Sequence, residues 1–474
     1  MKNILVVDLD GTLVSTDMLY ESFWSAFSKD WTVLIKSFFW LLKGKANLKN
    51  NLYIVSNIDV TNLPYNNEVI DLIKKYKKKS THIALVTATN QNMANKIANY
   101  LNIFDEVKGS TNKINLQGKL KANFLKNRYG ARGFDYVGDS LDDLHSWKKA
   151  KKAILVNNDP SIIKACKKVN SNFKQLKKKS SKNLTLEYIK TIRVHQWIKN
   201  ILVFAPMFAA NQLTLENFNN SFIAFIAFCL SASSTYLFND LVDLKADRSH
   251  SYKKFRPIAN GIVSIKNAMI LLLIMFLSSM LLAYSIGVYF LLTIFTYCIL
   301  SISYSLIIKK IVILDIFFLC TLYTLRIYSG GVATEIPLSF WLITFSIFLF
   351  LSLAAIKRQS ELVNLKKSKK SRLVLGRGYS IEDLPFVSMI ALSAGFISVL
   401  IAGFYINSSE IMIVYSKIWS LGLACITLLF WLIKILYASS NGLIIDDPII
   451  YALKDGTSRI CLIIILFLFS INFI

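Results

Sequence analysis

The sequence lacks paired cysteines. Its six cysteines include no CxxC pair and most lie inside apolar segments, so neither a zinc site nor a disulfide framework is indicated. A cleavable signal is also missing, because the opening segment MKNILVVDLDG is apolar for only a few residues and ends in acidic groups. We therefore expect the first domain to stay in the cytoplasm.

Motifs for nucleic-acid recognition are missing as well, although the net charge is +26. A nucleic-acid binder would carry its basic residues on a soluble domain with aromatic or groove-reading motifs. The apolar content of 54% is unevenly spread. Residues 1 to about 180 mix short β-branched runs with polar segments, whereas from about Thr185 most stretches between loops are long enough to cross a bilayer. A soluble domain therefore precedes a membrane domain.

Basic residues are absent from alternate loops of the membrane region. If the N-terminal end is inside, the loops on the opposite side contain no Lys or Arg. The positive-inside rule then predicts a multi-pass protein of the inner membrane with a cytoplasmic N-terminal domain. Nine spans are expected, at about 188–210, 218–239, 266–286, 288–308, 311–333, 339–356, 385–406, 412–437 and 458–474.

Short strands followed by polar turns organise the N-terminal domain. Residues 3–7, 82–90 and 134–140 each follow this pattern, and helical stretches lie between them. The alternation predicts an α/β fold with a Rossmann-like parallel sheet, whose functional groups lie at the carboxyl ends of the strands. Residues from about 16 to 76 are aromatic and helical in period, and we interpret them as a helical cap over that site.

Domain boundaries follow from this division. We assign residues 1–163 to the α/β domain, 164–184 to a Lys-rich linker and 185–474 to an all-α membrane domain. The linker has two open interpretations, a solvated connection with little structure or a segment attracted to anionic lipid headgroups.

Three carboxylates follow the second predicted span. Asp240, Asp243 and Asp247 stand at i, i+3 and i+7, a spacing that would place them on one face of a helix. Carboxylates crowded at a membrane boundary repel one another and need compensating cations. A divalent metal that also binds phosphate oxygens, typically Mg²⁺, would supply that charge. The alternative is a solvated helix end, which rarely carries acids at this spacing directly after a span.

The acidic string NDLVDLKAD, at residues 239–247, resembles the first aspartate-rich motif of the UbiA superfamily of intramembrane prenyltransferases. The resemblance covers residues 185–474 and implies a Mg²⁺-bound diphosphate held by these carboxylates. Further segments resemble the family's first helix, its basic loop and its fourth-to-fifth-span loop, namely RVHQWIKN at 193–200, KKFRPIANG at 253–261 and YSLIIKK at 304–310.

The second acidic motif of the family's aromatic-ring enzymes is missing. They carry it in the loop after the sixth span, whereas here that loop has no Asp before Asp383 and begins with Lys357, Arg358 and Glu361. Arg and Lys can hold a phosphate directly, without a metal bridge. This departure favours one metal-bound diphosphate and one metal-free phosphate as ligands.

That pattern resembles the decaprenyl-phosphate phosphoribosyltransferase branch of the family, as does the segment at 314–331, in which Asp315, Tyr323 and Arg326 would face the site. The resemblance implies phosphoribosyl pyrophosphate as donor and a polyprenyl phosphate as acceptor. Each basic residue assigned to phosphate could instead be a positive-inside residue without a ligand. The predicted substrate-binding residues are Lys199, Asn239, Lys254, Arg256, Tyr304, Lys309, Asp315, Arg326, Lys357, Arg358 and Glu361. His195 and His250 are interpreted as packing or hydrogen-bonding residues rather than acid–base groups.

The N-terminal domain carries four motifs in the order of the haloacid dehalogenase (HAD) superfamily. DLDGTL supplies Asp8 and Asp10 directly after a strand and resembles that superfamily's first motif. The resemblance implies that Asp8 attacks phosphorus, while Asp10 protonates the leaving oxygen and then activates water. A domain that kept the fold and lost the activity is disfavoured, since no motif position is missing. The other motif residues are Thr87 and Lys121, or less favourably Lys119, for phosphoryl oxygens, and Asp139 and Asp143, which with Asp8 would hold Mg²⁺.

Together these features predict a bifunctional enzyme that transfers phosphoribose to a polyprenyl phosphate and then removes a phosphate from the product. Two alternatives stay open. One is a UbiA-type aromatic polyprenyltransferase with an accessory phosphatase domain. The other is a transporter that uses the intramembrane acids as an ion path, although no broken-helix repeat favours it. The sequence is compatible with a homo-oligomer.

Overall fold

The computed structural model describes residues 3–157, 159–176, 183–250, 252–368, 377–408, 415, 417–445 and 447–471. The chain forms two compact units, one of residues 1–192 and 237–270 and the other of residues 193–236 and 271–474. The acidic segment at 239–247 therefore belongs to the same unit as the N-terminal domain. Residues 177–182 of the predicted linker lie outside the described residues.

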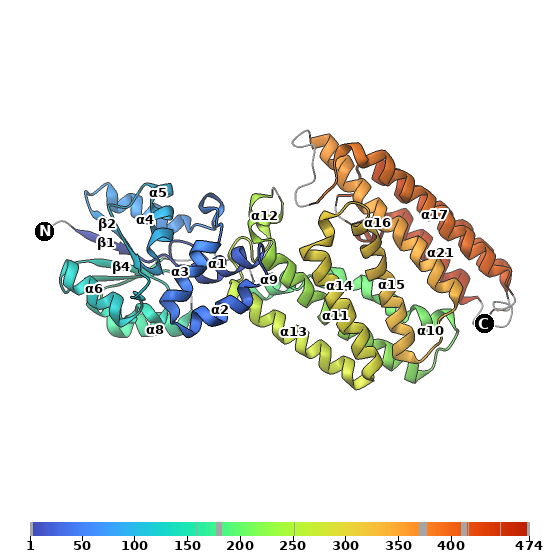
Figure 1. Cartoon of the computed structure of the whole chain (residues 1–474), viewed down its shortest axis with the longest axis horizontal. Helices are drawn as coiled ribbons and strands as arrows, with labels where there is room; N and C mark the ends of the chain where they lie inside the picture. The colour runs from blue at the N-terminus through green and yellow to red at the C-terminus, as the bar shows by residue number, and fades with distance from the viewer. Residues whose placement is uncertain are drawn as a thin grey trace. The chain divides into compact units, whose positions relative to one another are not determined.

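A six-stranded parallel sheet forms the centre of the first unit (Figure 1). Its strand order is β3-β2-β1-β4-β5-β6. The parallel α/β fold predicted for the N-terminal domain is confirmed, and the three predicted strands are β1, β2 and β4. The strands are β1 (Ile4–Val7), β2 (His82–Asn90), β3 (Glu106–Ser110), β4 (Asp135–Gly138), β5 (Lys152–Leu155) and β6 (Phe173–Gln175).

Two apolar cores cover the two faces of this sheet, because successive side chains of a strand point to opposite faces. Leu5 and Val7 of β1 belong to the core on one face, and Val6 belongs to the core on the other. Figure 1 shows α4 and α5 on one side of the sheet and α6 and α8 on the opposite side. The helices are α4 (Asn67–Lys77), α5 (Gln91–Leu101), α6 (Lys119–Tyr129), α7 (Leu144–Lys149) and α8 (Pro160–Val169).

The sheet reverses its winding between β1 and β4. The chain leaves β1 for β2 on one side, while β4 pairs with β1 on the other side, with Val7 opposite Val137. In open α/β sheets, ligands bind beyond the carboxyl ends of the strands at such a reversal. The backbone N–H of Asp8 donates to the carbonyl of Val137 over 3.0 Å, so the loops after the two strands lie side by side.

The α/β fold extends further than the predicted boundary at residue 163. Helix α8 continues to Val169, and β6 adds a sixth strand within the segment that we predicted as linker. The helix begins at Pro160, and the side chain of Asp159 caps it by accepting from the N–H of Ser161. The Lys-rich composition of this segment did not predict the helix and the strand, because their lysines are on the exposed side.

Most of the residues predicted to form a helical cap are helical, but those from Asn67 onward belong to α4, which packs on the sheet. They lie between β1 and β2 and include a small apolar cluster built on Val33, Leu48 and Leu52. The elements are α1 (Met18–Phe27), α2 (Val33–Leu42), α3 (Lys45–Val55) and the short 3₁₀ helix η1 (Val60–Asn62).

Seven helices of the described residues are long and apolar enough to cross a membrane. They match seven of the nine predicted spans, and the protein is a multi-pass membrane protein. These helices are α11 (Leu215–Val242), α13 (Ile265–Ile286), α14 (Val288–Leu306), α15 (Leu314–Thr334), α16 (Phe340–Ser368), α17 (Leu384–Ile406) and α19 (Ile418–Ser440).

The predicted spans at 188–210 and 458–474 differ from the structure. The first is not one helix, because Arg193 adopts a left-handed backbone conformation with φ of 54° and a 3₁₀ segment follows it. The second is a helix of 15 residues, shorter than the ~20 residues that a span needs. The elements concerned are α9 (Leu184–Thr191), η3 (Val194–Phe204), α10 (Ala205–Ala209) and α21 (Gly456–Ser470).

Candidate functional site

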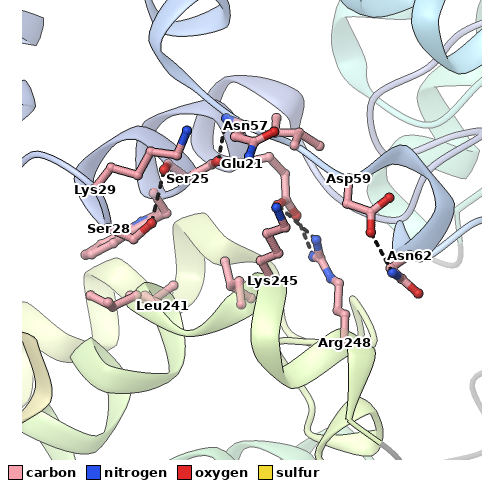
Figure 2. A pocket seen from close by; sticks show the side chains of 14 residues that line it. Glu21, Ser25, Ser28, Lys29, Asn57, Asp59, Asn62, Leu241, Lys245 and Arg248 are labelled. Atoms are coloured by element: carbon pink, nitrogen blue, oxygen red, sulfur yellow. Dashed lines mark hydrogen bonds and ion pairs between the residues drawn. The ribbon is translucent and has the colours of Figure 1, made fainter. Parts of the chain in front are cut away.

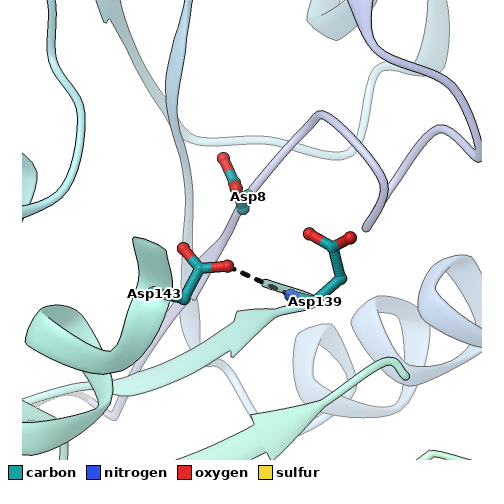
Figure 3. Close-up of side chains that lie close together, drawn as sticks. All are labelled: Asp8, Asp139 and Asp143. Carbon is teal, nitrogen blue, oxygen red and sulfur yellow. Dashed lines mark hydrogen bonds between the residues drawn. The ribbon is translucent and has the colours of Figure 1, made fainter. Parts of the chain in front are cut away.

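Three carboxylates meet where β1 and β4 end. Asp8 follows β1, and Asp139 and Asp143 follow β4, so the strand pairing brings them together. One oxygen from each lies within 4.8 Å of the others (Figure 3). A set of carboxylate oxygens suits a hard cation such as Mg²⁺. The sequence prediction of these three residues as one acidic group agrees with their placement.

Lys121 of α6 lies beside these acids. Its Nζ is 2.9 Å from Oδ1 of Asp8 and 3.5 Å from Oδ1 of Asp143, and it is buried with both. The hydroxyl of Tyr136 accepts from Lys121 over 3.1 Å and donates to Asp143 over 2.6 Å, which fixes the lysine between the two carboxylates. Lys119, the less favoured candidate, is exposed.

Asp10 is oriented by hydrogen bonds to both of its carboxylate oxygens. Oδ1 accepts from the backbone N–H of Met18 over 2.8 Å, and Oδ2 accepts from the hydroxyl of Thr89 over 2.6 Å. Thr87, which the motif pointed to, lies farther from Oδ2, at 3.5 Å. Its neighbour Thr89 therefore holds Asp10 more closely, a role that the motif did not indicate.

Lys49 is a further basic group that the sequence did not reveal. It extends from α3, and its Nζ donates to the carbonyl of Ala88 over 2.6 Å and to Oδ1 of Asn115 over 3.0 Å. Burial lowers the pKa of Lys49, and the charges of Asp10 and Asp17 oppose that change. No motif could identify this residue, because it lies in an insertion without recognisable chemistry.

The electrostatics of this site are set by burial. Burial raises the pKa of Asp8 to about 7, with Lys121 opposing and Asp143 and Asp10 adding to the rise. Burial alone would lower the pKa of Lys121, but Asp8 and Asp143 hold it above its ordinary value. Near neutral pH, Asp8 is therefore balanced between its two protonation states, and a bound cation would favour the ionised one.

The acidic segment of the membrane domain is not one continuous helix. Helix α11 ends at Val242 and α12 (Leu244–Ser249) begins after Asp243, although the N–H groups of Asp243 and Asp247 still donate to the carbonyls four residues earlier. Asp240 and Asp247 lie on the same side, because Arg256 contacts both. Among the described residues, Asp240, Asp243 and Asp247 do not meet the spacing that groups Asp8 with Asp139 and Asp143.

Arg256 supplies the positive charge that these acids need. Its Nη1 lies 3.0 Å from Oδ1 of Asp240 and 2.5 Å from Oδ2 of Asp247. Burial raises the pKa of Asp247, which the charge of Arg256 opposes. Arg256, predicted to bind phosphate, thus bridges the two acids in this structure. A ligand that brings its own cation could take over this charge compensation and free the guanidinium.

The same acidic segment contacts the cap helix α1. Figure 2 shows Glu21 facing Arg248, and two short hydrogen bonds of 2.9 and 2.5 Å join them. Both side chains are buried, at 5% and 7% exposed. Arg248 also donates to the carbonyl of Ala259 over 2.9 Å, in the loop that carries Arg256. The cavity beside this contact measures about 70 Å³, room for a few waters and too small for a sugar phosphate.

A second charged group lies in the other unit. Lys199 of η3 and Lys357 of α16 both approach Oδ2 of Asp447, at 2.5 and 3.5 Å. Burial alone would raise the pKa of Asp447, but the two lysines hold it below its ordinary value. Lys199 also lies over the ring of Tyr323, 5.6 Å from its centroid. Sequence reasoning missed Asp447, because it caps a short helix, α20 (Pro448–Lys454), and reads as a helix start.

Arg358 is at the centre of a neighbouring network. Its guanidinium donates to Asp315 over 2.5 Å, to Glu361 over 2.5 Å and to the hydroxyl of Tyr304 over 2.9 Å. Four predicted residues thus come together from α14, α15 and α16. Each of the three guanidinium nitrogens of Arg358 has a protein partner. Arg377, which sequence reasoning did not select, pairs with Glu361 over 3.1 Å.

The remaining predicted residues are more dispersed. Arg326 donates to Asn200 over 2.8 Å and to the hydroxyl of Tyr297 over 3.0 Å, and it is buried among apolar helices. Lys254 is exposed, while Asn239 and Lys309 are half-buried. His250 accepts from the N–H of Tyr252 over 3.2 Å, in keeping with a hydrogen-bonding role. His195 lies on η3.

Comparison with known proteins shows the class to which this chain belongs. Residues 201–438 match the sequence model of the UbiA prenyltransferase family, which is half of the chain. The chain is a member of this family of membrane transferases. It is 32% identical over 458 residues to the uncharacterized protein y4nM of Sinorhizobium fredii, covering 96% of this chain and 88% of the relative. That alignment includes the N-terminal domain.

Two further similarities concern the membrane domain. The chain is 34% identical over 218 residues to the decaprenyl-phosphate phosphoribosyltransferase of Mycolicibacterium smegmatis, covering 45% of this chain and 69% of the relative. A solved UbiA homolog from Archaeoglobus fulgidus, with bound GPP and Mg²⁺, aligns with a TM-score of 0.46 at 15% identity, covering 60% of this chain and 99% of that chain.

The protonation of Asp8 generates a prediction about metal binding. Because the carboxyl must lose its proton to coordinate Mg²⁺, affinity should fall by about tenfold per pH unit below the pKa of Asp8 and level off above it. Calorimetric Mg²⁺ titration of the full chain at several pH values measures this, with Asp8→Asn identifying the contribution of this site. An affinity of the Asp8-dependent site that is constant across this range would contradict the assignment.

The buried ion pair of Glu21 with Arg248 generates a prediction about the local stability of residues 244–249. Glu21→Gln leaves a buried guanidinium without its charge partner, so the free energy of opening of residues 244–249 should fall by about 3–5 kcal/mol. Amide hydrogen exchange of the full chain measures this. Glu106→Gln is the matched control, because it breaks the exposed pair with Arg128 and should cost no more than about 1 kcal/mol. Equal effects of the two variants would refute the prediction.

Proposed function

We propose that the membrane domain transfers phosphoribose from phosphoribosyl pyrophosphate to a polyprenyl phosphate. In this proposal the N-terminal domain is a HAD-type phosphohydrolase that removes the 5-phosphate of the product. The observation that carries the proposal is the pair of lysines around Asp447, the buried Lys199 and the half-buried Lys357. The family's aromatic-ring enzymes resemble this chain less, because they have a second acidic motif after the sixth span. The name of the Mycolicibacterium relative gives the proposal independent support.

Two phosphate-binding regions are needed for this transfer. Asp240 and Asp247, with Asp243, would hold the pyrophosphate of the donor through Mg²⁺, which neutralises the leaving group as it departs. Lys199 and Lys357 would hold the acceptor phosphate by direct charge-assisted hydrogen bonds. Asp447 would hold both ammonium groups close together until the phosphate arrives.

The transfer itself needs no general base. A phosphate oxygen of the polyprenyl phosphate attacks the anomeric carbon of the ribose, and the bond from that carbon to the pyrophosphate oxygen breaks. Positive charge develops on the ribose as pyrophosphate leaves. Because the nucleophile is already an anion, the protein contributes positioning and charge stabilisation, and these can supply most of the rate enhancement.

The N-terminal site would then act on the phosphomonoester. Asp8 attacks phosphorus and forms an aspartyl phosphate, while Asp10 gives its proton to the leaving ribose oxygen. Asp10 next takes a proton from the water that attacks the aspartyl phosphate, and inorganic phosphate is released. Lys121, at 2.9 Å from Asp8, neutralises phosphoryl oxygens throughout. Lys49 would bind the anionic phosphodiester on the other side of the ribose.

Both activities would share one side of the membrane. The acidic segment and the N-terminal domain lie in one unit, and the charge pattern of the loops favours the cytoplasmic side of the inner membrane. The phosphorylated product would then be formed and hydrolysed in the same compartment.

A direct assay tests the transfer. Full chain in lipid nanodiscs, given radiolabelled phosphoribosyl pyrophosphate, polyprenyl phosphate and Mg²⁺, should form a labelled lipid. Asp240→Asn and Asp247→Asn should lower kcat/KM by at least about a hundredfold, since each removes a charge that compensates the leaving pyrophosphate. Formation of a prenylated aromatic product from an isoprenyl diphosphate, with no labelled phosphoribosyl lipid, would disprove the donor assignment.

A single substitution separates the two proposed activities. Asp8→Asn should leave transfer intact while the lipid product keeps its 5-phosphate, because only the nucleophile of the N-terminal site is lost. Mass spectrometry of the lipid products distinguishes the two forms by one phosphate. Glu68→Gln, a change on α4 away from the site, serves as the control. Dephosphorylated product from the Asp8→Asn protein would exclude Asp8 as the nucleophile.

A further inference from the structure

Helix α2 exposes an apolar face that a water-soluble domain would cover. Five of its apolar side chains are more than half exposed, and the most exposed are Leu42 at 70%, Phe38 at 62% and Leu34 at 59%. Trp31, just before the helix, is 65% exposed. Contiguous exposed apolar surface of this kind marks an interaction site rather than ordinary surface variation. We call this surface the α2 face, and it consists of Trp31, Leu34, Ile35, Phe38, Phe39, Leu41 and Leu42.

The other side of α2 is already occupied. Val33 is 1% exposed and packs with Leu48 and Leu52 of α3, and Trp40 packs against the same cluster. The helix is therefore apolar around most of its circumference, a composition typical of helices that are buried on all sides. Only one side is buried by the described residues, so the α2 face needs an additional apolar environment.

The length and charges of α2 indicate a bilayer surface as that environment. Ten residues span only about 15 Å, too short to cross a membrane. Lys29, Lys36 and Lys43 are exposed around the helix. Amphipathic helices with basic and aromatic residues lie in the plane of the lipid–water interface, where the basic residues meet anionic headgroups.

The contacts of α1 indicate how the α2 face reaches lipid. Trp24 and Phe27 of α1 contact Phe238 edge-on, with ring centroids 5.9 and 6.0 Å apart. Phe238 lies in the last turns of α11, one of the membrane-crossing helices. The buried pair of Glu21 with Arg248 fixes α1 at the same place. Helix α2 follows α1 directly, so the α2 face begins where a span leaves the bilayer.

We propose that α2 is an interfacial helix whose exposed face inserts into the headgroup region of the membrane. This docking holds the cap on the bilayer surface, where a phosphate attached to a membrane lipid would be found. The inference goes beyond the proposed chemistry, because it rests on the exposure and the composition of α2 and holds whichever lipid the enzyme uses.

Photo-crosslinking in the full chain tests the contact directly. A benzophenone amino acid replaces Phe38, and the protein is reconstituted in nanodiscs of phosphatidylcholine and phosphatidylglycerol. The matched control places the same amino acid at Leu120 of α6, which is 55% exposed in the same domain. Irradiation should give at least about tenfold more phospholipid adduct at position 38 than at position 120, because a side chain in the headgroup region touches lipid continuously.

Two other results would overturn the proposal. Equal lipid labelling at the two positions would show that the α2 face is in water. Crosslinks from position 38 to a second copy of the chain, in place of lipid, would show that a dimer covers it.

An activity measurement separates docking from chemistry. The double variant Phe38→Glu and Phe39→Glu should lower hydrolysis of a lipid-linked sugar phosphate by at least about tenfold and leave hydrolysis of p-nitrophenyl phosphate unchanged. Leu120→Glu should affect neither reaction. If the unaltered protein hydrolyses neither substrate, the proposed phosphatase function fails, while the crosslinking result still decides whether α2 docks on lipid.

Discussion

The ion pairs of Arg256 with Asp240 and Asp247 hold together the part of the structure on which the transferase site depends. Three acids in eight residues at the end of a membrane span repel one another, and burial makes each charge costlier. One guanidinium nitrogen, Nη1 of Arg256, donates to both carboxylates and compensates their charge. The loop from Tyr252 to Gly261 is shaped by that requirement, because it must return Arg256 to the end of α11.

The same requirement recurs at three other buried carboxylates of the described residues. Asp8 is paired with Lys121, Asp447 with Lys199 and Lys357, and Asp315 with Arg358. These pairs contribute little net stability, because desolvation offsets most of the attraction. They do fix the geometry of groups that must be ready for a charged ligand. At the proposed acceptor site, Asp447 supplies the negative charge between the two lysines.

Much of this arrangement could be predicted from the sequence. The strands of the α/β domain and seven spans carry strong local patterns, and the acids of the N-terminal motifs meet because parallel strands end at one edge. The interruption between α11 and α12 at Asp243 could not be predicted, because the carboxylates keep helical spacing across it. The first predicted span was wrong for a similar reason. Its composition is apolar, but the left-handed Arg193 is a backbone property.

Several residues with partners distant in the sequence belong to no recognisable motif. Glu21 and Arg248 are 227 positions apart, and neither belongs to a motif. Lys49 and Asp447 are ordinary surface-type residues in the sequence, and only the fold places them near groups of opposite charge. The exposed apolar side of α2 was visible as an aromatic helical pattern, but a pattern alone does not tell which side of a helix the rest of the chain covers.

The end of α11 at Val242 affects the electrostatic potential around the acidic segment. A helix of 28 residues presents the equivalent of about half a negative charge at its carboxyl end. Asp240 is in the last turn of α11, where the dipole of this helix disfavours a negative charge. The local potential is therefore more negative than the formal charges of the side chains alone would produce. A negative potential distinguishes ions by their charge. A doubly charged ion therefore gains about twice as much electrostatic energy there as K⁺ or Na⁺ at the same distance.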